Sequence, residues 1–149
     1  MNQTIQLLQD VLRNARTGES AADQLCRRAQ DEALRRALKD EADRYADFAE
    51  EARDQLASAG GTPEPVGVAA RAGMWMGIEM KTLTDASDSH IAELVIQGAT
   101  MGITEMTKAL NSRAGAGPEA ADLARRFVDW QRREIETMKP RLRNAVPHA

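Results

Sequence analysis

The sequence has few aromatic residues, one cysteine and no long apolar run. Only 3% of its 149 residues are aromatic, and β-branched residues are sparse. No stretch alternates apolar and polar residues over the length of a strand, so an all-helical class is favoured over a β-sheet. Because Cys26 is the single cysteine, no disulfide framework can form within one chain, and we expect a reducing, cytoplasmic compartment.

Two further absences bear on partners. No apolar run approaches the ~20 residues that a membrane helix needs, and residues 1–10 lack the basic region and long apolar run of a signal peptide. The net charge is −3. Residues 35–41 show how arginines and lysines alternate with acids, which is typical of a solvated helix face. We therefore expect neither a membrane span nor a nucleic-acid partner.

The sequence does have apolar residues at helical spacing. We predict a single domain, residues 1–149, whose helices cover about residues 4–29, 31–58, 66–83, 89–111 and 118–142. Asp31 can cap the second helix, and Gly60 and Gly61 end it. Pro118 suits a first helical turn, and Pro140 should kink or end the last helix.

The lengths of the connections predict a topology. A turn at residues 30–31 and a loop at 112–117 are short, so each joins two antiparallel helices. The connection between these two pairs is much longer, and its ~16 helical residues would span roughly 24 Å. Two antiparallel hairpins joined by a helical crossover between the second and third bundle helices form the ferritin-like four-helix bundle, which is the fold that we predict.

One carboxylate, Glu19, stands in an apolar stripe of the first helix. The stripe recurs at steps of three and four: Ile5, Leu8, Leu12, Ala15, Glu19, Ala22, Cys26 and Ala29. Such spacing places all its members on the face that packs against a core. A buried carboxylate is unfavourable unless it is paired, hydrogen-bonded or bound to a metal.

Glu19 suggests a comparison with di-iron bundles, which take a Glu from each of two helices and a Glu-x-x-His from each of the other two. When residues are counted away from the turn at 30–31 along both helices, Glu41 and Tyr45 fall at about the same height in the bundle as Glu19. The inward line of the second helix is Leu34, Leu38, Glu41, Tyr45, Phe48, Ala52 and Leu56. Tyr45 and Phe48 therefore stand where that helix should carry its Glu-x-x-His.

The third and fourth helices also depart from the di-iron pattern. Ala99 occupies the position of the third helix's Glu, and Gln131-x-x-Glu134 occupies that of the last Glu-x-x-His. His90 begins a helix and His148 lies in the tail, so neither histidine is level with the other positions. The only metal-ligand candidates are thus Glu19, Glu134, Gln131 and Tyr45.

Three interpretations of Glu19 follow. The favoured one has no metal or other cofactor, and Glu19 hydrogen-bonds Tyr45 or pairs with Arg44 or Arg16. The second is a di-iron-type site of iron or another divalent metal with non-standard ligands. The third is a weakly bound ion, or a site that a second chain completes.

A methionine-rich stretch in the predicted crossover is the best candidate for a surface. It consists of Met74, Trp75, Met76 and Met80. Packing of the crossover over the bundle explains it most simply. A protein interface is the alternative, since Met and Trp are enriched in interface cores, and we expect self-association as a dimer.

The stretch from Met80 to Glu105, MKTLTDASDSHIAELVIQGATMGITE, resembles an uncharacterised family of small bacterial helical proteins. The segment from Asn14 to Gly18 and Tyr45 also fit that pattern. The resemblance covers most of the chain and implies an offshoot of the ferritin-like superfamily, a domain of unknown function. It implies no activity, and therefore no catalytic residues.

Fold and composition together favour a non-enzymatic protein with a structural or protein-interaction role and a degenerate ferritin-like metal site. The alternative is a metal-binding, di-iron-type protein or oxidoreductase with a non-standard site. A carrier of a small apolar ligand is the third possibility.

Overall fold

A computed structural model of the chain describes residues 2–64 and 85–144. These residues form four long helices and no strand: α1 (Gln3–Arg28), α2 (Glu32–Ser58), α4 (Asp88–Ser112) and α5 (Pro118–Met138). A short 3₁₀ turn, η1 (Lys139–Arg141), follows α5. The predicted all-helical class is confirmed for these residues. None of their helices combines the length and hydropathy that crossing a membrane requires.

The helix ends are fixed by local chemistry. The Asn2 side chain accepts hydrogen bonds from the first turn of α1, and Asp31 accepts one from Leu34 N at 2.8 Å at the start of α2. Ser87 Oγ caps α4 in the same way. Gly60, with φ +80°, lies just beyond α2 in the left-handed region that glycine enters without steric penalty. Pro140 falls within η1, so α5 ends before it at Met138.

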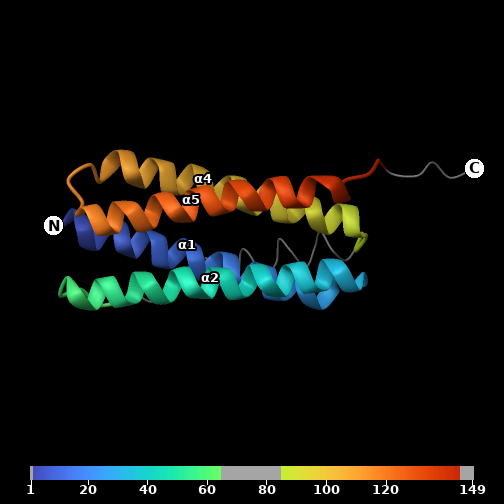
Figure 1. Ribbon diagram of the computed structural model, residues 1–149, viewed down its shortest axis with the longest axis horizontal. Helices are drawn as coiled ribbons and strands as arrows, with labels where there is room; N and C mark the ends of the chain where they lie inside the picture. The colour runs from blue at the N-terminus through green and yellow to red at the C-terminus, as the bar shows by residue number, and fades with distance from the viewer. Residues whose placement is uncertain (1, 65–84, 145–149) are drawn as a thin grey trace, which may run out of the picture.

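The four helices pack as two antiparallel hairpins, α1 with α2 and α4 with α5 (Figure 1). Each hairpin is joined by a short connection, residues 29–31 or 113–117. The α2 helix ends at the opposite end of the bundle from the start of α4 (Figure 1). Residues 65–84 lie outside the described residues, and so do the predicted crossover helix 66–83 and its candidate interface residues Met74, Trp75, Met76 and Met80.

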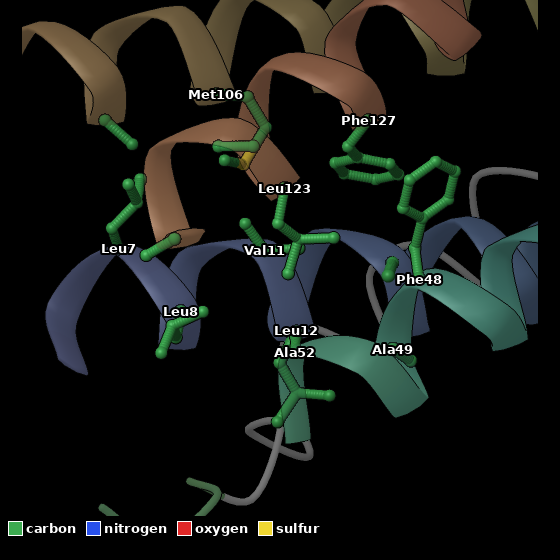
Figure 2. Close-up of a cluster of buried hydrophobic side chains, with 14 of the residues drawn as sticks. Leu7, Leu8, Val11, Leu12, Phe48, Ala49, Ala52, Met106, Leu123 and Phe127 are labelled. Atoms are coloured by element: carbon green, nitrogen blue, oxygen red, sulfur yellow. The ribbon is translucent and has the colours of Figure 1, made fainter. Parts of the chain in front are cut away.

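One end of the bundle contains a large hydrophobic cluster, which we call the aromatic cluster. Figure 2 shows its side chains pointing toward one another, and Phe48 lies against Phe127 with ring centroids 5.1 Å apart. Its largest buried members are Leu7, Leu8, Val11, Leu12, Tyr45, Phe48, Leu56, Met106, Leu123, Phe127, Val128 and Trp130. They come from all four helices, so the interior at this end of the bundle is mostly apolar, with Asp10 as a buried charged residue beside it.

The other end contains a smaller cluster without aromatic residues, the aliphatic cluster. It consists of Leu25, Ala29, Leu34, Leu38, Ile91, Ala92, Leu94, Val95 and Met138. Between the two clusters, α2 and α5 bring polar side chains into the interior. We call Glu41, Tyr45, Gln131 and Glu134 the polar layer.

The inward face of α1 differs by one residue from the predicted stripe. Leu25 is buried whereas Cys26 is only partly buried, and Gly18 rather than Glu19 faces the Tyr45 ring of α2. Both sets of positions satisfy steps of three and four, so the periodicity alone could not separate them. The ring of Tyr45 determines which set faces the bundle, because it packs directly on the Cα of Gly18.

Candidate functional site: a polar layer inside the bundle

Glu41 is a buried carboxyl in the bundle interior. Its side chain projects from α2 on the same face as Leu34, Leu38 and Tyr45, and only 5% of Glu41 is exposed. Burial raises the pKa of Glu41 to about 8, and both the charge of Glu134 and a hydrogen bond to it add to this effect. The pKa of Glu134 is also raised, chiefly by burial. Burial and the adjacent Glu134 therefore favour the protonated form of Glu41 near neutral pH.

Tyr45 and Gln131 form the second half of the polar layer. Gln131 is 2% exposed, and its Nε2 donates to Tyr45 Oη at 3.5 Å. Burial and the charge of Glu41 raise the pKa of Tyr45, so its phenol keeps its proton. The Tyr45 ring meets Trp130 edge-on, with centroids 4.7 Å apart, which ties the polar layer to the aromatic cluster.

Two buried oxygens in this layer are not satisfied by protein donors. Among the described residues, neither Gln131 Oε1 nor Glu41 Oε2 receives a hydrogen bond from an N–H or hydroxyl group. The Glu41 carboxyl has its contact with Glu134, but the Gln131 amide oxygen has none. A buried acceptor of this kind costs about 1–3 kcal/mol, so such groups in native proteins need an explanation.

Two glycines make room for the polar layer. A Cβ at Gly18 on α1 would overlap the ring of Tyr45, and a Cβ at Gly102 on α4 would overlap the amide of Gln131. Both side chains therefore lie flat against the backbone of a neighbouring helix. At Gly102 the side chain of Gln131 fills the space that a Cβ would take. At Gly98 an added Cβ would have no described atom within 4 Å.

A cleft of about 130 Å³ opens between α1 and α4, directly over the polar layer. Its floor is formed by Glu41, Tyr45 and Gln131. The walls come from α1 and α4 and are mainly small or apolar: Thr17, Gly18, Ala21, Ala22, Leu25, Leu94, Val95, Gly98, Ala99, Met101 and Gly102. Met101 is 66% exposed, which makes it the most exposed of the large apolar side chains in the described residues.

Glu19 does not belong to this site, which corrects the sequence-based prediction. It does not line the cleft. Within the described parts of the chain it makes no hydrogen bond or ion pair, and this applies to all three expected partners, Tyr45, Arg44 and Arg16. Partial burial and the nearby charges of Asp23 and Asp43 raise its pKa. Because α1 presents Gly18 inward, Glu19 lies beside the acidic outer face of α2 rather than in the interior.

The remaining predicted candidates do come together. Glu134, Gln131 and Tyr45 all lie in the polar layer, and Glu41 takes the place expected for Glu19. The signal for Glu41 was present in the sequence, since the inward line of the second helix includes it. His90 remains apart at the start of α4, where its Nδ1 lies 3.7 Å from Glu93 Oε2.

The donor set of the polar layer does not fit a di-iron centre. Such a centre takes four carboxylates and two imidazoles, whereas the layer offers two carboxyls, one amide and one phenol. Within residues 2–64 and 85–144, no three His, Cys, Asp or Glu side chains are placed to hold one ion. We therefore derive no chemistry from iron at this position.

Over the described residues, fold and site together define a class: a bundle of four long helices whose interior is interrupted by a polar layer beneath a small cleft. The sequence belongs to a family described as "Domain of unknown function (DUF2383)", whose profile matches residues 3–112. The matched range includes Gly18, Glu41, Tyr45 and Gly102 but ends before Gln131. No curated protein matches the chain.

The fold is shared with a solved structure, described as a crystal structure of a DUF305 fragment from Deinococcus radiodurans. The two superpose with a TM-score of 0.72 over 94% of this chain and 95% of that one, at 21% sequence identity. At this identity the similarity establishes the helical architecture and carries no information on function.

Proposed function

We propose that this protein is a non-enzymatic binding protein on a ferritin-like bundle, whose interior site takes a small molecule and no metal cofactor. The observation that carries this proposal is the cleft over Glu41 and Gln131, because each of these buried side chains offers an oxygen that no described protein donor satisfies. A ligand that enters the cleft would lie against these two side chains.

Three features support a ferritin-like origin. The helices form two antiparallel hairpins, a long connection separates the hairpins, and polar residues meet at mid-height on the inward faces. The polar layer has no di-iron ligand set because it has lost the imidazoles and because Ala99 replaces the expected third-helix carboxylate.

The chemistry of the polar layer supports a non-enzymatic role. Burial favours the protonated form of Glu41 near neutral pH and raises the pKa of the Tyr45 phenol, so neither group presents an anionic nucleophile at neutral pH. No serine or cysteine lines the described walls of the cleft. The arrangement is suited to hydrogen-bonding a guest rather than to transforming it.

Metal analysis of the full chain, purified without added metal, tests the cofactor part of this proposal. We expect iron, manganese and zinc to be far below one equivalent per chain, both in the wild type and in Glu41→Ala. Stoichiometric metal in the wild type that is lost in Glu41→Ala, but kept in Glu50→Ala on the exposed face of α2, would contradict the proposal and favour a metal-binding protein.

A further inference from the structure

We propose that the outer face of α4 binds a second copy of this chain, in an antiparallel pair of α4 helices related by a two-fold axis. The sequence led to the expectation of a dimer, and this face provides a surface for one within the described residues. The inference goes beyond the proposed function, and it does not require a ligand in the cleft.

The outer face of α4 has no charge at its centre. Residues 94–104 include no Asp, Glu, Lys or Arg, although 29% of the chain is charged. On α2, by contrast, every exposed residue from Arg35 to Asp54 is charged. Depletion of charged side chains is typical of the core of a protein interface. The exposed residues of the uncharged stretch are Gln97, Gly98, Thr100, Met101 and Thr104.

The side-chain donors of this face already have hydrogen-bond partners within α4. Thr100 Oγ1 donates to the carbonyl of Ile96 at 2.8 Å, and Thr104 Oγ1 donates to that of Thr100 at 2.9 Å. Gln97 Nε2 donates to Glu93 Oε1 at 3.5 Å. A buried donor without a partner is costly, so a face whose donors are satisfied within its own helix loses contact with water at a lower cost.

Met101 supplies an apolar side chain near the middle of this face, where it is 66% exposed. The unbranched thioether chain of methionine adapts its shape to a partner, and methionine is enriched in interfaces. Met101 also lines the cleft between α1 and α4. The α4 helix of a second copy would therefore lie over the open side of the cleft and help to enclose it.

The charges that flank the uncharged stretch indicate the direction of the pair. Glu93 precedes the stretch and Lys108 follows it, and their side chains are 55% and 70% exposed. With a two-fold axis between Thr100 and Met101, each residue faces the residue that lies equally far on the other side of the axis. Glu93 of each copy then faces Lys108 of the other, whereas a parallel pair in register would place like charges together.

Sedimentation velocity of the full-length protein measures the association. We expect monomer at ~1 µM and dimer at ~200 µM, with a Kd on the order of 10 µM for a small and mainly polar interface. Met101→Lys places a charge at the centre of the face and should raise the Kd at least about tenfold. Leu142→Lys is the matched control, since Leu142 is the other exposed large apolar residue of the described chain, and it should leave the Kd unchanged.

A charge exchange tests the antiparallel direction. Glu93→Lys and Lys108→Glu each place like charges opposite one another at both ends of the pair, so each should raise the Kd about tenfold at low ionic strength. The double variant restores opposite charges and should return the Kd to within about threefold of the wild type. Glu50→Lys makes the same reversal on the exposed face of α2 and should have no effect.

Three results would overturn the inference. The first is a chain that stays monomeric at ~200 µM. The second is a dimer that Met101→Lys leaves intact, because its contact would then lie on another surface. The third is a double variant that associates as weakly as the single variants, which would exclude the antiparallel arrangement. Unchanged far-ultraviolet circular dichroism in each variant shows that a loss of association is not a loss of fold.

Discussion

The aromatic cluster and the polar layer are neighbours in the same bundle, but one buries apolar side chains and the other buries polar ones. In the aromatic cluster, side chains from four helices fill the interior with apolar atoms (Figure 2). In the polar layer, one helical turn away on α2, a carboxyl and an amide are buried with incomplete hydrogen bonding. Replacing Glu41 and Gln131 with apolar residues would make a more stable bundle. The difference indicates that the aromatic cluster adds to the stability of the bundle and that the polar layer reduces it.

The largest expected effect belongs to the aromatic cluster. Phe127 is fully buried, and its ring contacts those of Tyr45 and Phe48. We expect Phe127→Ala to lower the free energy of unfolding by about 3–5 kcal/mol, measured by urea denaturation. Leu142→Ala is the control, since Leu142 is 39% exposed and its loss should change stability by less than about 0.5 kcal/mol. Equal effects of the two substitutions would contradict the assignment of the core.

The polar layer should respond to a substitution in the opposite direction. The pKa of Glu41 is about 8 in the folded protein, above its ordinary value of 4.5, so the folded state holds a proton that the unfolded state releases. The stabilising effect of this proton is complete below about pH 4.5 and is lost as the pH rises to about 8. Glu134, whose pKa is raised as well, acts with the same sign.

Glu41→Gln should therefore remove much of this pH dependence. We expect the variant to be more stable than the wild type by on the order of 2–3 kcal/mol at pH 8, and close to it near pH 4.5. Urea denaturation at both pH values measures the effect, and Glu50→Gln gives the baseline for loss of an exposed charge. A variant that is less stable than the wild type at pH 8 would show that Glu41 is ionised and satisfied in the native state.

The third comparison uses two glycines that both border the cleft. Gly18→Ala should lower stability by about 1–2 kcal/mol, because the added methyl overlaps the ring of Tyr45. The ring is held between Trp130 and Phe127 and cannot move away freely. Thermal unfolding followed by circular dichroism provides the measurement.

The smallest effect is expected at the second glycine. Gly98→Ala meets no described atom within 4 Å, so it should stabilise α4 by about 0.5–1 kcal/mol through helix propensity alone. The same thermal unfolding experiment compares it with Gly18→Ala. If the two substitutions shift the melting temperature in the same direction, the close contact between α1 and Tyr45 is absent in solution.

The sequence predicts the local features of this fold well. Helix ends depend on caps and breakers that act within one turn, so Asp31, Gly60 and Pro118 could be recognised without tertiary information. The inward face of α2 was equally clear, because its large apolar residues leave a single consistent register. The one-residue difference on α1 was not predictable, since Gly18 and Glu19 both fit the spacing of the stripe. The choice between them depends on a tertiary contact, the packing of the Tyr45 ring of α2 on Gly18.

The candidate site was predictable only in part. Gln131 and Glu134 could be located by their level in the bundle, and Tyr45 by its place opposite the first helix. The cleft itself is lined by small residues, Gly98 on α4 and Ala21 and Ala22 on α1, and the space beside Gly98 is open. Only the packed arrangement of α1 against α4 shows that these small residues leave a space that opens onto Glu41.

The central claim is that the middle of the bundle contains a buried carboxyl that keeps its proton at neutral pH. Carbon-13 NMR of the Glu41 carboxyl, followed from pH 4 to pH 10 in the wild type and assigned with Glu41→Gln, tests this claim most directly. We predict a titration midpoint near pH 8, accompanied by a shift of the Glu134 carboxyl. A midpoint near the ordinary glutamate value of about 4.3 would contradict the account, because Glu41 would then be solvated or paired and the polar layer would not be the interior site described above.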